Sequence, residues 1–294
     1  MNSHLKDLVS LLDLEKLEEN LYRGQSRHLD GKSVFGGQVI GQALVAATRT
    51  VDNAPPHSLH AYFLRPGDMT QSIVYEVDRV RDGRSFIARR VQAIQNGQPI
   101  LSMIASFQKP EPGLEHQTPM PAVPPPENQP DIYGLRKAWL AQHPEIDEAY
   151  RSRMLRAPAI EFRAITPANP MDIGVRAPLQ RFWFRAAGKL PDDPLLHQAL
   201  LAYASDFNLL STALLPHAKG WFSNEMICAS IDHAIWFHRP VRVDDWLLYD
   251  MDAPTAQAAR GFSRGLIYDR SGRLVASVAQ ESLMRDTSLS NGKP

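Results

Sequence analysis

The apolar residues near the amino terminus recur at the spacing of an α-helix in two places. Leucines recur among acidic residues over 5–21, which predicts a short amphipathic helix leading into the first strand. Apolar residues recur in the same way over 34–47, which predicts a second helix. Three glycines in that stretch, Gly36, Gly37 and Gly41, lower its helix propensity but allow a neighbouring backbone to come close. We therefore expect this helix to be held tightly against a sheet.

The residues that follow the second helix are dominated by strand-like runs. Turn signals separate these runs, and Asp82-Gly83 and Asn96-Gly97 are among the better short hairpin signatures. The pattern predicts an antiparallel meander after a central helix. The four predicted strands cover residues 57–65, 72–81, 85–95 and 99–108.

The composition changes sharply after residue 109. Seven prolines between 110 and 126 disfavour regular helix or sheet and indicate a linker. A modest helix is predicted over 135–155, and strand-like texture resumes at 160–165 and 181–186. We therefore divide the chain into an amino-terminal unit (1–109), a proline-rich linker with a short helix (110–158) and a carboxy-terminal unit (159–294).

The carboxy-terminal unit repeats the element order of the first. A helix is predicted to begin at Asp193-Pro194, a capping residue followed by proline, and to run to about Leu214. Four strands are predicted after it, over residues 226–240, 246–252, 257–268 and 274–284.

Two landmarks indicate that the repetition is an internal duplication. Tyr62-Phe63-Leu64-Arg65-Pro66 resembles Trp236-Phe237-His238-Arg239-Pro240, and aligning Arg65 with Arg239 gives an offset of 174 residues. The turns at Gly97 and Gly272 align with an offset of 175 residues. Nearly equal offsets predict an α+β fold in which two copies of an antiparallel sheet each wrap around a central helix, a fused double hotdog. Pairing of the copies edge to edge would protect their free edges. The alternative is two unrelated α+β domains joined at the linker.

The length, composition and charge of the chain exclude several classes of function. The 294 residues are 44% hydrophobic, enough for a sizeable core, and 32 basic residues balance 32 acidic ones. This balance argues against a nucleic-acid partner. A single cysteine excludes an intramolecular disulfide, and no apolar run is long enough to span a bilayer. We expect a cytoplasmic protein without membrane insertion. The chain lacks a G-x-S-x-G elbow and nucleotide-binding motifs, and we expect neither a metal nor another cofactor.

An acidic residue distinguishes the second central helix from the first. No acidic residue occurs between Val34 and Val51, whereas the second helix carries Asp206 among apolar residues. Ser230 and Gln280 are likewise polar residues within apolar strands. If alternation turns both towards the helix, they converge on Asp206. Otherwise Asp206 lies on an exposed polar face, Ser230 bonds to backbone and Gln280 faces water.

Four stretches resemble the type II acyl-CoA thioesterase family, whose bacterial members are TesB-like and whose fold is the double hotdog. The resemblance covers residues 5–284. The stretches are Val34-Phe35-Gly36-Gly37-Gln38-Val39-Ile40-Gly41-Gln42-Ala43-Leu44, Tyr62-Phe63-Leu64-Arg65-Pro66-Gly67, Asp82-Gly83-Arg84-Ser85-Phe86 and Trp236-Phe237-His238-Arg239-Pro240.

The resemblance implies hydrolysis of acyl-CoA thioesters to free fatty acid and CoA. The family's catalytic Asp and Gln fall on Asp206 and Gln280, and its strand Thr falls on Ser230. Serine lacks the methyl group that stiffens a threonine rotamer. A family histidine near the acyl-thioester site matches His57, which implies contact with substrate. Asp206 would act as a general base or as a nucleophile, and as a base it would take a proton from a water molecule that Ser230 and Gln280 hold in line with the thioester carbonyl.

Family habit and exposed sheet edges also imply a homo-oligomer, a dimer or a tetramer. Two other functions stay open. A hotdog hydratase would carry a histidine five residues after the aspartate, but that position here is Ser211. A protein that binds or senses acyl-CoA without hydrolysing it would keep the pocket and lack turnover.

Overall fold

The computed structural model describes residues 2–27, 33–167, 169, 171, 174–219 and 225–289. The first helix, α1 (Ser3–Leu12), ends well before the predicted Leu21. A short hairpin follows it, formed by β1 (Glu15–Glu18) and β2 (Leu21–Gly24), which pair antiparallel. Asn20 makes the turn in the left-handed conformation (φ 60°). The prediction of helix beyond Leu12 was therefore wrong, because backbone pairing outweighs the local helical pattern.

The remaining elements of the amino-terminal half agree with the predicted ones. The second helix, α2 (Gly36–Thr48), is buried along almost its whole length. The four meander strands are β3 (Pro56–Phe63), β4 (Ile73–Asp82), β5 (Phe86–Gln95) and β6 (Gln98–Gln108).

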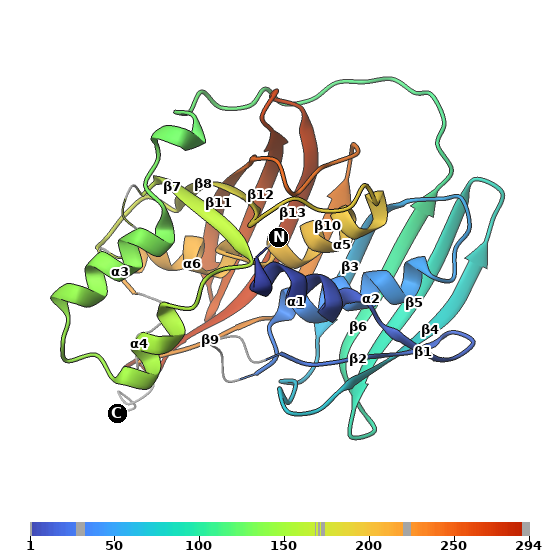
Figure 1. Cartoon of the computed structure of the whole chain (residues 1–294), viewed down its shortest axis with the longest axis horizontal. Coiled ribbons are helices and arrows are strands. Elements are labelled where there is room, and N and C mark those ends of the chain that lie inside the picture. The colour runs from blue at the N-terminus through green and yellow to red at the C-terminus, as the bar shows by residue number, and fades with distance from the viewer. Residues whose placement is uncertain are drawn as a thin grey trace.

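The linker runs without regular structure from residue 109 to 125 and arches from the end of β6 towards the other half (Figure 1). It then forms a short 3-10 turn, Pro126–Asn128. The predicted helix over 135–155 is two helices, α3 (Ile132–Gln142) and α4 (Glu148–Met154). Pro144 explains the interruption, because proline disfavours helical conformation in the residue before it, and His143 lies outside α3 as its C-cap.

The carboxy-terminal half differs from its predicted elements at two points. The predicted helix breaks into α5 (Pro194–Ser205) and α6 (Leu209–Leu214), and the predicted strand over 226–240 breaks at Ile231. The strands of this half are β7 (Ile160–Thr166), β8 (Leu179–Ala186), β9 (Met226–Ser230), β10 (Asp232–Phe237), β11 (Leu247–Gln257), β12 (Arg260–Asp269) and β13 (Leu274–Asp286).

The strands form one antiparallel sheet whose order is symmetric about its centre. The order is β1-β2-β4-β5-β6-β3-β10-β13-β12-β11-β8-β7, with β9 added to β13. Strands β3 and β10 join the two halves edge to edge, and His60 lies opposite Ala234 at the centre of this junction. Each half has the same order of hairpin, helix and meander. The fold is therefore the predicted α+β double hotdog, with an amino-terminal repeat (β1–β6 and α2) and a carboxy-terminal repeat (β7–β13 and α5).

Matching side chains support the same duplication. Arg65 Nη1 donates to the Pro99 carbonyl at 2.8 Å, and Arg239 Nη1 donates to the Leu274 carbonyl at 2.8 Å. Each arginine ties the end of its repeat's first meander strand to the start of the fourth. The two arginines therefore stabilise the ends of these strands.

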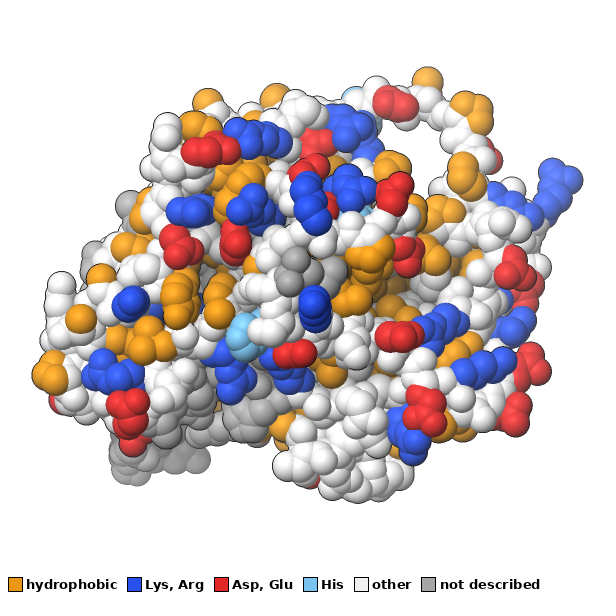
Figure 2. All heavy atoms as spheres, viewed as in Figure 1, with side chains coloured by type: hydrophobic (Ala, Val, Ile, Leu, Met, Phe, Trp, Pro, Cys, Tyr) orange, Lys and Arg blue, Asp and Glu red, His pale blue; other side chains and the backbone are white. Residues whose placement is uncertain are grey.

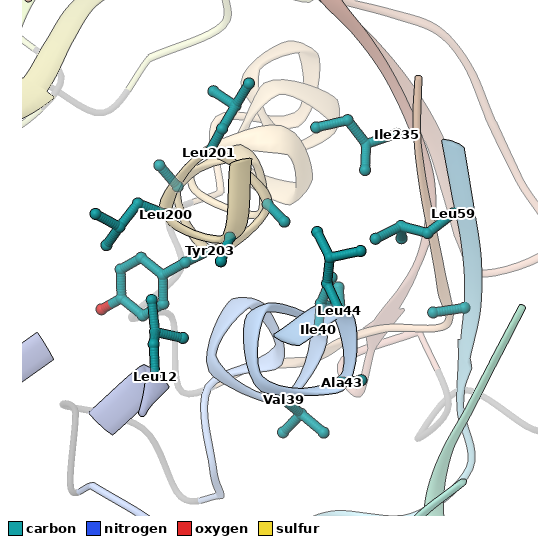
Figure 3. Packing of buried hydrophobic residues seen from close by; sticks show 14 of the residues in the cluster. Leu12, Val39, Ile40, Ala43, Leu44, Leu59, Leu200, Leu201, Tyr203 and Ile235 are labelled. Atoms are coloured by element: carbon teal, nitrogen blue, oxygen red, sulfur yellow. The ribbon is translucent and has the colours of Figure 1, made fainter. Parts of the chain in front are cut away.

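The two central helices pack against each other inside the curved sheet. A Cβ atom on Gly41 would lie 3.2 Å from the Ala199 carbonyl oxygen, so the helices approach closely where these residues meet. Figure 3 shows Leu59 and Ile235 pointing from the junction strands towards the two helices. Helices and inner sheet face thus share one core.

The distribution of charged side chains on the surface agrees with the equal numbers of basic and acidic residues in the sequence. In Figure 2, basic and acidic side chains are interspersed over the coloured part of the face shown. Within the described ranges, no helix has both the length and the apolar character needed to cross a bilayer.

Candidate active site

Asp206 lies where α5 ends, at its C-cap position. The helix stops here because Asn208 adopts the left-handed conformation (φ 69°), which a helix cannot continue through and which asparagine tolerates better than most residues. The Asp206 side chain is turned inwards, and the residue is only 9% exposed. The exposed polar face considered as an alternative is therefore excluded.

The carboxylate of Asp206 meets the start of the other repeat's helix. Its Oδ2 accepts a 2.8 Å hydrogen bond from the Gly37 backbone N–H. The N-cap residue of α2, Phe35, makes no side-chain capping bond. Asp206 therefore satisfies one of the first-turn N–H groups, and the positive end of the helix dipole favours its negative charge.

Glycines make this approach possible. A Cβ atom on Gly36 would lie 2.7 Å from Asp206 Oδ2, and one on Gly37 would lie 2.3 Å from the Tyr203 carbonyl oxygen. Any larger residue at these positions would push the helix start away from the carboxylate.

Ser230 and Gln280 converge on the same carboxylate. Gln280 Nε2 donates to Ser230 Oγ at 3.0 Å, and Ser230 Oγ lies 3.5 Å from Asp206 Oδ1, a long hydrogen bond. Ser230 is the last residue of β9, and Gln280 lies on the inner face of β13 with only 1% exposure. The structure thus brings together the three residues that the sequence proposed as a site.

A fourth polar residue, His233, was not among the sequence candidates. Its Nδ1 lies 2.8 Å from Gln280 Oε1, and its Nε2 lies 2.9 Å from Ser205 Oγ. The residue is 1% exposed. Strand alternation could have found it, because His233 shares the inner face of β10 with Ile235 and Phe237.

Burial dominates the electrostatics of Asp206. Removal from water raises the pKa of its carboxyl group above the ordinary value for aspartate. The electrostatic contribution of His233 and hydrogen bonds from Gly37, Ser230 and Gln280 oppose this rise in pKa. A carboxylate with a raised pKa is a better proton acceptor than an ordinary surface aspartate.

His57 does not join this cluster. Phe63 of β3 lies beside Gly36 at the site, and His57 precedes it by six residues, which at strand spacing corresponds to about 20 Å. Its Nε2 lies 2.8 Å from Ser106 Oγ, and its ring contacts Phe86 edge-on at 5.7 Å. Burial lowers the pKa of His57. Its contact with substrate stays a prediction.

The duplication creates a second position equivalent to this site, and that position lacks the carboxylate, the imidazole and the side-chain amide. Gly41 and Ala199 meet where the two helices cross. Thr48 lies seven residues after Gly41, just as Asp206 lies seven residues after Ala199, so Thr48 occupies the position equivalent to Asp206. In the sheet, the register places Leu59 where the other repeat has His233, and Ala105 where it has Gln280. Among the residues that the structure describes, the duplicated unit therefore forms one candidate site of this kind, built by the carboxy-terminal repeat with the Gly37 N–H from the other repeat.

Family models match both halves of the chain. Residues 25–108 match the family described as "Acyl-CoA thioesterase N-terminal domain", and residues 163–283 match the one described as "Acyl-CoA thioesterase".

Curated relatives match over nearly the whole chain. Acyl-CoA thioesterase 2 of Haemophilus influenzae is 40% identical over 97% of this chain and 99% of its own length. Acyl-coenzyme A thioesterase 8 of Mus musculus is 41% identical over 95% of this chain and 88% of its own length.

A solved structure of an acyl-CoA thioesterase is similar to this chain both in sequence and in fold. The crystal structure of acyl-CoA thioesterase II TesB2 from Mycobacterium marinum is 41% identical in sequence, with a TM-score of 0.78. The match covers 95% of this chain and 98% of that one. With the duplicated fold and near full-length identity around 40%, this chain belongs to the acyl-CoA thioesterase family.

Proposed function

We propose that this protein hydrolyses acyl-CoA thioesters to free fatty acid and CoA at the cluster of Asp206, Ser230 and Gln280. The observation that carries the proposal is the buried Asp206 carboxylate, bonded to Gly37 and lined by the two other side chains, in a chain whose relatives are named acyl-CoA thioesterases.

In the proposed reaction, Asp206 is the general base. Ser230 and Gln280 hold a water molecule beside the Asp206 carboxylate, in line with the thioester carbonyl carbon. Asp206 takes one proton as the water oxygen bonds to that carbon. The carbon–sulfur bond then breaks, CoA leaves as a thiolate and takes the proton from Asp206, which restores the carboxylate, and the acyl group leaves as the carboxylic acid. The low basicity of a thiolate makes it a good leaving group, so the site needs neither a metal nor another cofactor.

The direct test is release of free CoA thiol from acyl-CoA substrates of increasing chain length. We expect turnover with at least one chain length, and loss of turnover in Asp206→Asn with acyl-CoA affinity retained. Binding of acyl-CoA without thiol release at any length would overturn hydrolysis and leave an acyl-CoA sensor.

Single-turnover hydrolysis in ¹⁸O-water tests the role of Asp206 as a base. A general base leaves one ¹⁸O atom in every fatty acid molecule of the first turnover. Fatty acid without label in that turnover would indicate that Asp206 attacks the thioester as a nucleophile.

The same proposal includes substrate contact by His57, a cytoplasmic location and assembly into dimers or tetramers. The outer sheet face exposes apolar side chains beside the junction of the repeats, including Tyr62 (58% exposed) and Ile104 (47% exposed). Such surface is favoured at subunit interfaces. Light scattering of the purified protein tests the assembly, and a monomer mass at micromolar concentration would refute it.

A further inference from the structure

Gln280 has two possible amide orientations, and only one suits the proposed reaction. With Nε2 towards Ser230, as in the structure, the amide donates to the serine hydroxyl, which keeps its own proton for the Asp206 carboxylate. With the amide reversed, Oε1 would accept the serine proton instead, and Ser230 could no longer donate to Asp206.

We propose that His233 is a positioning residue that fixes the Gln280 amide with Nε2 facing Ser230. The proposal rests on the hydrolytic function of the cluster. His233 Nδ1 lies 2.8 Å from Gln280 Oε1, and a carbonyl oxygen only accepts, so Nδ1 carries a proton. His233 therefore donates to one end of the amide and leaves the other end to donate to Ser230.

The hydrogen bonds then run in one direction. His233 Nδ1–H donates to Gln280 Oε1, Gln280 Nε2–H to Ser230 Oγ, and Ser230 O–H towards Asp206 Oδ1. These three donors point towards the carboxylate, so each bond polarises the next, while Gln280 Nε2 also donates to Ser282 Oγ at 3.2 Å. On its far side, His233 Nε2 lies 2.9 Å from Ser205 Oγ, which holds the ring in place.

The amino-terminal repeat provides a comparison for the buried pair of His233 and Gln280. Leu59 and Ala105 occupy the positions equivalent to His233 and Gln280, as the register around His60 and Ala234 requires. Both residues are fully buried, and Figure 3 shows Leu59 pointing towards the helices. The same fold thus forms with an apolar pair at these positions.

The two repeats distinguish what the fold requires at these positions from what the reaction requires. His233 and Gln280 are each 1% exposed, and burying polar groups costs free energy unless they are hydrogen-bonded. In this repeat the hydrogen bonds to Gln280 and Ser230 offset that cost. The apolar pair in the other repeat shows that the fold does not require polar residues here, and we assign the polar pair to the reaction.

Two substitutions with opposite geometry test the proposal. In His233→Asn, the amide nitrogen occupies the place of Nδ1 and still donates to Gln280. In His233→Gln, the amide reaches the place of Nε2 and keeps only the contact with Ser205. We expect kcat to fall about 100-fold in His233→Gln with KM changed less than about threefold, and His233→Asn to recover most of that loss.

Two further variants control for folding. His197→Asn removes another buried imidazole, which accepts from the Val243 backbone N–H near the other end of α5, and should leave kcat unchanged. The double variant His233→Leu with Gln280→Ala copies the other repeat, and we expect it to be inactive with a melting temperature close to that of the wild type.

The proposal fails if His233→Gln keeps wild-type kcat, or if His233→Asn is as impaired as His233→Gln at equal thermal stability. A two-bond ¹H–¹⁵N correlation spectrum gives a readout independent of activity, and an unprotonated Nδ1 on His233 would also overturn it. If the wild type releases no CoA thiol, the proposed function itself has failed. If the wild type is active and Asp206→Asn inactive while His233→Gln is unaffected, only the role of His233 is refuted.

Discussion

The Gly37 backbone N–H of the amino-terminal repeat donates a 2.8 Å hydrogen bond to the Asp206 carboxylate of the carboxy-terminal repeat. The site is therefore shared by both copies of the duplicated unit, although the side chains come from one of them. This sharing gives a physical reason for keeping both copies in one chain, because the start of α2 must stay registered against the end of α5.

Asp206→Asn should lower kcat by about 100- to 10,000-fold, the range expected for loss of a general base. Duplication should not rescue the activity, because Thr48 occupies the equivalent position in the other repeat. Thiol release measured against acyl-CoA checks the loss. Residual activity above half of the wild-type value would contradict a single site.

The pH dependence of kcat/KM should follow the raised pKa of Asp206. Only the ionised carboxylate accepts a proton, so activity should fall as pH decreases through that pKa, at a higher pH than for an ordinary aspartate. Rates between pH 4 and 8 in buffers of constant ionic strength, roughly spanning the usual aspartate range and neutrality, measure this limb. A profile flat down to the ordinary aspartate range would show that Asp206 is not the base.

The same raised pKa predicts a stability effect. The folded protein holds the Asp206 proton more tightly than the unfolded chain, so stability declines as pH rises from the unfolded pKa to the folded pKa. An asparagine side chain at this position cannot ionise and avoids this loss. Asp206→Asn should therefore melt higher than the wild type at neutral pH, by about 2–4 °C for each kcal/mol recovered, with the difference shrinking in acid. Equal melting temperatures at both pH values would contradict it.

Gly37→Ala should impair both stability and activity. The added Cβ would meet the Tyr203 carbonyl oxygen at 2.3 Å, a contact that only a backbone shift relieves, and the shift would move the N–H away from Asp206. We expect a lower melting temperature and a kcat reduced at least tenfold. Gly134→Ala in α3 is the matched control, because its Cβ would make only ordinary contacts and the change favours helix by up to about 1 kcal/mol. Similar behaviour of the two variants would refute the close approach of α2 and α5.

Ser230 offers a graded test of the water-holding role. Ser230→Ala removes the hydroxyl between Gln280 and Asp206 and should lower kcat by about 100-fold. Ser230→Thr keeps the hydroxyl and restricts its rotamer, so activity should be maintained or should rise modestly. Steady-state kinetics of the two variants check this, and an unimpaired Ser230→Ala would remove Ser230 from the mechanism.

The sequence by itself determined the duplicated fold, because period and turn chemistry are local properties that survive in each copy. It also identified Asp206, Ser230 and Gln280 as polar residues in apolar elements. The sequence did not show where these elements end. Helix α5 stops at Asp206 because Asn208 adopts the left-handed conformation. The predicted strand over 226–240 breaks at Ile231, whose N–H donates to the Glu281 carbonyl and whose carbonyl accepts from the Phe63 N–H.

Only the tertiary structure decided which groups meet around Asp206. The Gly37 N–H belongs to a helix 169 residues away in sequence, and His233 reaches Gln280 across 47 residues. Neither pair has a local pattern, because backbone amides carry no sequence signal and alternation places His233 on the inner face of β10 without showing that it meets Gln280. Packing of the two repeats around one core brings these groups within hydrogen-bonding distance.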